Sequence, residues 1–163
     1  MAMILIGFMG SGKSTVAKAL GERLGLDVLE LDDEINELSG KTIPEIFAEE
    51  GEAGFRKYEY SVLLAACEND GIISTGGGIV TYDDSYEIIR NTDRKVIFLN
   101  AAFDSLYERI SDDNTRPLAS RPREQVKVLY DSRIERYRAA ADQEVDTACG
   151  LEDTVEAILS PTR

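Results

Sequence analysis

The sequence GFMGSGKS, from Gly7 to Ser14, constrains this chain of 163 residues more than any other segment. A glycine, any four residues, a second glycine, a lysine and a serine form the pattern of a phosphate-binding loop. Such a loop must follow a strand and open a helix. The apolar run 3–6 predicts the strand, and apolar residues at helical spacing up to Gly25 predict the helix. A glycine-rich turn without a ligand is the alternative, but it would not need these two flanking elements.

This loop predicts a site for a nucleoside triphosphate and Mg²⁺. Its glycines let backbone N–H groups and the N-terminal end of the helix face a phosphate. We expect Lys13 to reach the β- and γ-phosphates and Ser14 to offer its hydroxyl to Mg²⁺. For Thr15, the helix start or its packing is the alternative to a nucleotide contact. The candidate nucleotide contacts in the loop are Gly10, Ser11, Gly12, Lys13, Ser14 and Thr15.

Composition narrows the classes of function. The chain has the length of one domain, so a second substrate must bind to insertions within this fold. The formal charge of −13 argues against binding to nucleic acid or to an anionic membrane. Histidine is absent from the sequence, which excludes a serine–histidine–aspartate triad and a histidine zinc site.

Location and cysteine chemistry also follow from the sequence. No run is long enough to span a membrane, and no basic segment with a cleavage site precedes the first strand, so we expect a cytoplasmic protein. Cys67 and Cys149 lack the spacing of a zinc or redox motif. We expect both to be buried as small apolar residues.

Acidic residues follow the second predicted strand, 27–31. Glu30 lies in this strand and Asp32 at its exit, and in a parallel α/β sheet that end faces the ligand. Both are candidates to hold Mg²⁺ waters or to accept a proton from a substrate hydroxyl. Acids also favour the first turn of a helix, which is the interpretation we prefer for Asp33 and Glu34.

A helical segment follows. The sequence TIPE from Thr42 to Glu45 predicts a capping box with proline in the first turn. Gly51 is expected to break this helix, and the next helix carries Phe55 and Arg56. A single arginine on a helix is usually solvated, so position alone does not assign a ligand to it.

Three consecutive glycines, Gly76, Gly77 and Gly78, follow a third apolar strand. They would allow close approach of the backbone to a ligand, and a plain tight turn is the alternative. This strand lacks the terminal aspartate with which many P-loop enzymes orient Mg²⁺. Ser74 or Glu30 would have to take that place.

Strands and helices alternate along the chain, which predicts an α/β fold with a parallel sheet and helices on both faces. The third strand is predicted at 71–75, and two more at 95–99 and 144–147. Helices are predicted at 83–91, 105–110, about 124–140 and 151–159. Residues 111–123 have no apolar period, two prolines and three arginines. We expect a mobile loop over the site there, with a solvated connector as the alternative. Arg133 lies on an apolar stripe, where it would meet a substrate anion or a structural ion partner.

Several short motifs now stand in a fixed order. They are the phosphate loop, IPEIF at 43–47, GE at 51–52, FR at 55–56, the glycine triplet and RPL at 116–118. In this order and spacing they resemble the shikimate kinase family along nearly the whole chain. The resemblance implies a P-loop, nucleoside-monophosphate-kinase-like α/β fold whose five-stranded parallel sheet has the order 2-3-1-4-5. It also implies a single domain, 1–163, with a substrate-binding segment at about 31–60 and a lid at about 110–123.

The resemblance further implies a reaction: ATP, with Mg²⁺, phosphorylates the 3-hydroxyl of shikimate. Arg56 and Arg133 match the arginines that bind the shikimate carboxylate, and the backbone of the glycine triplet would hold the ring. Asp32 matches the aspartate that binds shikimate hydroxyls and can accept the proton. Arg116 matches the lid arginine that contacts the ATP phosphates, and Arg109 the residue that lies against adenine. The implied catalytic residues are Lys13, Asp32 and Arg116.

Three more positions match the family's acceptor pocket. Phe47 and Phe55 match its aromatic walls, and Glu59 matches the acid that orients the first arginine. One position departs: where the family commonly has an aspartate associated with the Mg²⁺ water shell, this chain has Glu30. The candidate metal residues are therefore Ser14 and Glu30, and Ser74 could share the function of the latter.

Two other functions compete with this interpretation. A kinase for a different small molecule, such as gluconate, would keep the phosphate loop. A regulatory protein that binds a nucleotide without transferring phosphate would do the same. Neither needs two arginines for a carboxylate together with the glycine triplet. We therefore expect small-molecule substrates, no nucleic acid or membrane partner, and a monomer.

Overall fold

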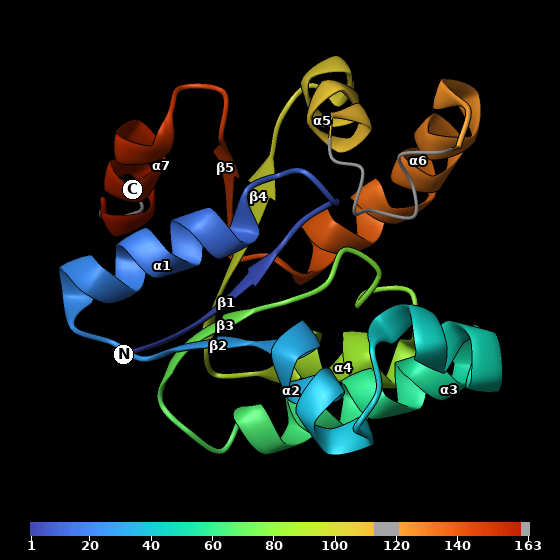
Figure 1. Cartoon of the computed structure of the whole chain (residues 1–163). Coiled ribbons are helices and arrows are strands. Elements are labelled where there is room, and N and C mark those ends of the chain that lie inside the picture. The colour runs from blue at the N-terminus through green and yellow to red at the C-terminus, as the bar shows by residue number, and fades with distance from the viewer. Residues whose placement is uncertain (113–120, 161–163) are drawn as a thin grey trace.

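The computed structural model describes residues 1–112 and 121–160 of the chain. A five-stranded parallel sheet lies at its centre, with the order β2-β3-β1-β4-β5. The strands are β1 (Ala2–Ile6), β2 (Val28–Glu30), β3 (Gly71–Ser74), β4 (Lys95–Asn100) and β5 (Gln143–Asp146). The helices are α1 (Lys13–Leu24), α2 (Leu31–Ser39), α3 (Ile43–Ala66), α4 (Asp83–Asn91), α5 (Phe103–Ser111), α6 (Arg123–Ala140) and α7 (Leu151–Leu159). Helices cover both faces of the sheet, which confirms the predicted fold class and strand order (Figure 1).

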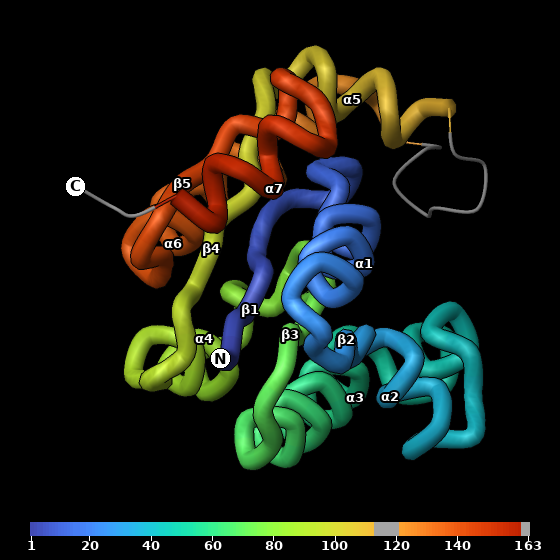
Figure 2. Tube along the Cα trace, turned by 90° about the vertical axis from the view of Figure 1, so that its left-hand side faces the viewer, coloured from blue at the N-terminus to red at the C-terminus, as the bar shows by residue number. Residues whose placement is uncertain are grey.

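The central strand β1 explains why the sheet needs two layers of helices. Its alternating residues point to opposite faces. Ile4 and Ile6 belong to a core formed with the helices α3, α4, α5 and α6. Met3 and Leu5 belong to a second core with α1 and α7, which lie side by side in Figure 2. A strand buried on both faces must be apolar throughout, as this run is.

The strand register brings three loops to one edge of the sheet. Ile4 of β1 is aligned with Ile73 of β3, and Glu30 of β2 is aligned with Ser74 of β3. In a parallel sheet the C-terminal ends of neighbouring strands lie together. The phosphate loop after β1, the start of α2 after β2 and the glycine triplet after β3 therefore open at the same edge.

Two expectations from the sequence are wrong. The second strand ends at Glu30 and α2 begins at Leu31, so the strand does not continue to residue 31 as predicted; Asp32 still follows the strand, in the first turn of α2. Leu31 is fully buried, and three acids, Asp32, Asp33 and Glu34, occupy the first turn of α2, where the helix dipole favours negative charge. The second wrong expectation is that both cysteines are buried. Cys149 is exposed, because it lies in the surface turn just before α7, and Cys67 is only partly buried.

The helix α3 is bent where the sequence predicts a break. The Thr42 hydroxyl accepts a hydrogen bond from the Glu45 backbone N–H, and the Glu45 carboxylate accepts one from the Thr42 N–H, which confirms the capping box. Gly51 adopts φ 72° and ψ −178°, a conformation open mainly to glycine. The segment before it therefore leaves α3 at an angle and forms a separate arm.

Candidate active site

The phosphate loop is closed around its own lysine. Gly12 caps α1 in the left-handed region, with φ 90°, and turns the chain into the helix. The Lys13 ammonium donates to the carbonyl oxygens of Gly7, at 2.6 Å, and Phe8, at 3.1 Å. A positive charge thus lies at the N-terminal end of a helix, where the helix dipole also favours anions. This arrangement fits the phosphates of a nucleotide.

Two oxygen groups that could hold a divalent cation lie beside this loop. The Ser14 hydroxyl donates to Oε2 of Glu30 at 3.2 Å. The aligned Ser74 hydroxyl is buried and has no hydrogen-bond partner within the described part of the chain. Among the described residues, no group of three or more acidic, histidine or cysteine side chains could hold a metal. The oxygen pair fits Mg²⁺, because Mg²⁺ takes one or two protein ligands and completes its shell with phosphates and water.

Arg56 of α3 is buried and held by two carboxylates. It is only 8% exposed, and it donates to Glu59 at 2.9 Å and to Glu52 at 3.3 Å. Burial raises the pKa of Glu59 to about 7, although the neighbouring Arg56 charge opposes this rise. Oε2 of Glu59 and Nε of Arg56 find no partner among the described residues. These two atoms could therefore form hydrogen bonds with a ligand or with water.

The glycine triplet lies against these groups. A Cβ atom on Gly78 would lie 2.2 Å from Nη2 of Arg56. A Cβ atom on Gly76 would lie 3.3 Å from Glu59 and 3.5 Å from Asp32. The absence of side chains is therefore required for the close approach of the arginine, which favours the binding interpretation over a plain turn.

Asp32 lies in the first turn of α2, at the mouth of the site. Its side chain remains accessible to solvent, but the surrounding protein raises its pKa by desolvation, and the nearby charge of Lys13 opposes this. The charge of Arg56 also acts on it. The charges of the phosphate-loop lysine and of the α3 arginine thus both act on Asp32, which suits a group that handles a transferred proton.

Arg133 approaches the same site from α6. Its guanidinium lies 5.8 Å from the centre of the Phe8 ring. Desolvation lowers the pKa of Arg133, and the like charge of Arg56 lowers it further. Two guanidinium groups from distant helices are thus close enough to repel each other. An anion between them would relieve this repulsion.

Known proteins share the sequence and the fold. The shikimate kinase family profile matches residues 9–162. The chain belongs to the shikimate kinase family. A shikimate kinase from Staphylococcus haemolyticus is 36% identical over 159 residues, covering 97% of this chain and 92% of that protein. One from Staphylococcus aureus is 39% identical over 146 residues, covering 89% and 83%.

Solved structures agree. A shikimate kinase from Acinetobacter baumannii in complex with shikimate superposes with a TM-score of 0.90 at 34% identity, covering 97% of this chain and 90% of that one. The enzyme from Aquifex aeolicus gives a TM-score of 0.86 at 36% identity, covering 98% and 94%. A gluconokinase from Sinorhizobium meliloti shares only the fold, with a TM-score of 0.57 and 19% identity over 97% of this chain and 89% of that one.

Most of the remaining residues expected from the shikimate kinase resemblance lie in the described part of the chain. The rings of Phe47 and Phe55 are 4.8 Å apart, and Phe47 is 40% exposed. Arg109 of α5 donates to the carbonyl oxygen of Gly10 at 2.9 Å, which places it against the phosphate loop. Thr15 is exposed, so it does not pack in the core. Arg116 and most of the expected lid lie outside the described residues.

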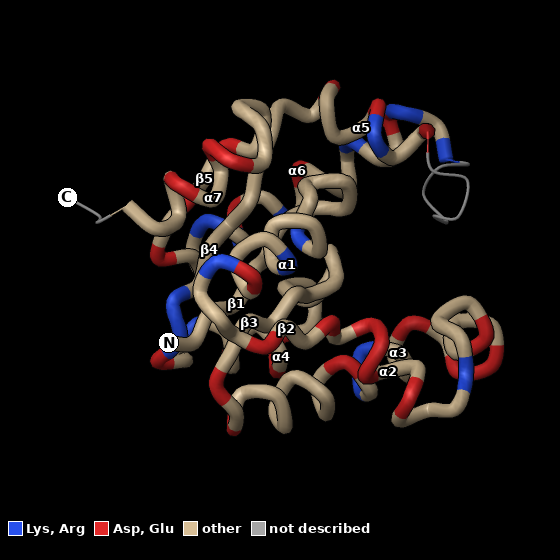
Figure 3. Tube along the Cα trace, turned by 60° about the vertical axis from the view of Figure 1, so that its left-hand side comes forward, with Lys and Arg blue, Asp and Glu red and all other residues tan. Residues whose placement is uncertain are grey.

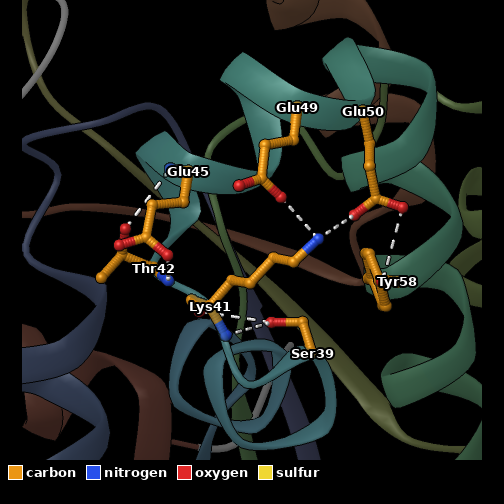
Figure 4. A network of polar contacts seen from close by, with 7 residues as sticks. All are labelled: Ser39, Lys41, Thr42, Glu45, Glu49, Glu50 and Tyr58. Atoms are coloured by element: carbon orange, nitrogen blue, oxygen red, sulfur yellow. Dashed lines mark hydrogen bonds and ion pairs between the residues drawn. The ribbon is translucent and has the colours of Figure 1, made fainter.

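The arm that carries Phe47 is held by a polar network (Figure 4). Lys41 pairs with Glu49 at 2.7 Å and with Glu50 at 3.5 Å. The Tyr58 hydroxyl, beyond the bend in α3, also donates to Glu50 at 3.5 Å. These contacts join the loop before α3, the arm and the main part of the helix, so they help to set the angle of the arm.

Most charges around the acceptor side are negative. Figure 3 shows acidic residues along α2 and α3. A carboxylated substrate would be repelled by such a surface except near Arg56 and Arg133. Sequence reasoning did not assign a function to Glu52, which pairs with Arg56, or to Tyr137, which contacts the glycine triplet. The spacing of Glu52 four residues before Arg56 on a helix was the available signal for the first pair.

Proposed function

We propose the following assignment of residues for the reaction of this family, in which the γ-phosphoryl group of ATP is transferred to the 3-hydroxyl of shikimate. The chain is a shikimate kinase by family, and the product, shikimate 3-phosphate, lies on the route to chorismate and the aromatic amino acids. We assign each substrate a position at the edge of the sheet where the three loops open.

The phosphate loop binds the nucleotide. The backbone of Gly10, Ser11 and Gly12 surrounds the phosphates, and Lys13 balances the charge on their β- and γ-oxygens. The Ser14 hydroxyl would bind Mg²⁺, and Glu30 would hold water molecules of the Mg²⁺ shell. The ion would neutralise further negative charge on the phosphates. The contacts of Lys13 with two loop carbonyls support this, because they already place its ammonium inside the loop.

The acceptor lies between α3 and α6. Arg56 and Arg133 bind its carboxylate, since guanidinium forks fix both the energy and the orientation of a carboxylate. The backbone of the glycine triplet holds the ring, and Phe47 and Phe55 line the pocket. Glu59 orients Arg56, as their 2.9 Å contact supports.

Asp32 orients the reacting hydroxyl and accepts its proton. A carboxylate whose pKa is raised above its ordinary value is a better proton acceptor than an ordinary one. The rest of the catalysis is positioning and charge balance, because phosphoryl transfer requires little covalent chemistry from the protein. Arg116, on the lid at about 110–123, would add a positive charge to the transferred group. Arg109 would lie against the adenine.

The organisation of the chain and its setting complete the proposal. One domain, 1–163, contains the substrate-binding segment at about 31–60 and the lid. We expect it to act as a cytoplasmic monomer without nucleic acid or membrane partners, since its charge of −13 would repel both. Within the described residues, no helix has the length and apolar character needed to cross a membrane.

One observation carries the acceptor assignment: the guanidinium of Arg133 lies near enough to Arg56 for the charge of Arg56 to help lower its pKa. The direct test is ADP formation from Mg-ATP that depends on added shikimate. Arg133→Ala should raise the shikimate KM about ten- to a hundredfold, because charge-assisted hydrogen bonds are lost, and should change the ATP KM much less.

Arg136→Ala is the matched control. Arg136 lies on the same helix, but it donates to the Val80 carbonyl and pairs with Asp83 at 2.9 Å, and neither of these partners belongs to the proposed acceptor site. It should leave the shikimate KM near the wild-type value. Equal increases in both KM values for Arg133→Ala would contradict the assignment.

A further inference from the structure

The hydroxyl of Tyr137 connects an acceptor arginine to the glycine triplet. Tyr137 lies on α6, four residues after Arg133, and is completely buried. Its ring stacks on Phe98 of β4, with centroids 5.0 Å apart and planes at 28°. Its hydroxyl donates to the carbonyl oxygen of Gly77 and also interacts with the Arg133 side chain. One buried phenol therefore contacts two parts of the acceptor site.

Both partners of this hydroxyl also rest on the phosphate loop. A Cβ atom on Gly77 would lie 3.1 Å from the backbone nitrogen of Met9, so the glycine backbone packs directly on the loop. The Arg133 guanidinium covers the ring of Phe8. A displacement of either partner would change the spacing between the acceptor and the phosphates. Transfer rates are sensitive to such small displacements.

The hydroxyl is suited to a fixed position. Burial raises the pKa of Tyr137, so the phenol keeps its proton and remains a donor to the Gly77 carbonyl at every physiological pH. Nε of Arg133 has no hydrogen-bond partner in the described ranges. Its contacts with Tyr137 and Phe8 therefore help to orient this guanidinium.

We propose that Tyr137 is a positioning residue for phosphoryl transfer: its hydroxyl sets Arg133 and the Gly77 backbone at the spacing that the carboxylate and ring of shikimate require. Tyr137 acts through these two groups and does not itself touch the reacting atoms. The proposal rests on the proposed function of Arg133 and adds a residue that the family resemblance did not supply.

The test compares two tyrosines on the same helix. Tyr137→Phe keeps the ring on Phe98 and removes only the hydroxyl. It should raise the shikimate KM about two- to tenfold, as expected for one lost hydrogen bond, and lower kcat, with the ATP KM within about twofold of wild type. Tyr130→Phe is the control, because the Tyr130 hydroxyl donates to Asn100 at 3.1 Å and its ring also packs near Phe8. It should change neither the shikimate KM nor kcat.

The outcomes distinguish the proposal for Tyr137 from the assignment of Arg133 on which it rests. If Tyr137→Phe raises both KM values equally, or if Tyr130→Phe gives the same profile, Tyr137 only supports packing and the proposal fails. If Arg133→Ala raises the shikimate KM but Tyr137→Phe does not, the proposal fails and the arginine assignment stands. If Arg133→Ala leaves the shikimate KM unchanged, the assignment itself fails. In the Arg133→Ala background, Tyr137→Phe should have a smaller effect than in the wild type.

A measurement on the wild-type protein does not depend on the variant folding. With ¹³C at Cζ of the seven tyrosines, the Tyr137 resonance is assigned by elimination with Tyr→Phe variants of the other six. It should shift when shikimate is added alone and stay in place when ADP is added alone. A resonance that does not move at saturating shikimate would overturn the proposal.

Discussion

Arg56 and Gly78 are in such close contact that the guanidinium of one excludes a side chain on the other. A Cβ atom on Gly78 would lie 2.2 Å from Nη2 of Arg56 and 2.8 Å from its Cζ. Gly78 does not have a positive φ, so glycine is needed here for space and not for backbone conformation. The backbone after β3 therefore forms one wall of the Arg56 site, while Glu59 and Glu52 hold the guanidinium from the helix side.

The first prediction uses this contact. Gly78→Ala should push the Arg56 guanidinium out of place and raise the shikimate KM at least about tenfold, with a much smaller change in the ATP KM. Gly76→Ala is the graded comparison, because its Cβ would meet carboxylate oxygens at 3.3 and 3.5 Å. Its effect in the same steady-state assay should be smaller. A larger effect of Gly76→Ala would show that the Arg56 contact is not decisive.

The second prediction concerns pH. The pKa of Glu59 is about 7 in the folded protein, against an ordinary value of 4.5, so the folded state binds more protons than the unfolded state between these values. The contribution of Glu59 to the free energy of unfolding should therefore decrease as pH rises from about 4.5 to 7. Glu59→Gln cannot titrate. Urea unfolding at several pH values should show wild type losing stability relative to Glu59→Gln across this window. A constant difference would contradict the raised pKa.

The third prediction concerns the arm before Gly51. Lys41→Met removes the ion pairs with Glu49 and Glu50, and it should raise the shikimate KM about twofold and increase amide hydrogen exchange over residues 43–50. High salt should reduce the difference from wild type, because the pairs are accessible to solvent. Lys127→Met removes a comparable lysine pair on α6, with Asp131 at 2.6 Å. This control should leave exchange over residues 43–50 unchanged.

The fourth prediction concerns the metal. Glu30→Gln weakens an acceptor of the Ser14 hydroxyl and removes a charge near the expected Mg²⁺ waters. The Mg²⁺ concentration for half-maximal activity should rise about tenfold, while the shikimate KM stays near its wild-type value. Glu37→Gln, an exposed residue of α2, is the control and should change neither quantity. An unchanged Mg²⁺ requirement in Glu30→Gln would assign the metal waters to other groups.

Local patterns in the sequence predicted the main elements of the fold. The phosphate loop, the capping box at Thr42 and the break at Gly51 each depend on residues within a few positions of one another. The alternation of apolar strands with amphipathic helices predicted the parallel sheet, and the family resemblance supplied its strand order. The predicted end of the second strand was wrong because a buried leucine such as Leu31 fits a strand and a first helical turn equally well.

The acceptor site was decided by tertiary structure. Sequence position alone assigned no ligand to Arg56, and only the family resemblance did; in the structure it is buried against Gly78 and paired with Glu59. Tyr137 was one more apolar residue on a helix until folding placed its hydroxyl on the Gly77 carbonyl. The physical reason is the separation along the chain of the residues that determine each feature. A loop or cap is determined by neighbours along the chain, whereas the desolvation and charge of a buried group depend on segments that only the folded sheet brings together.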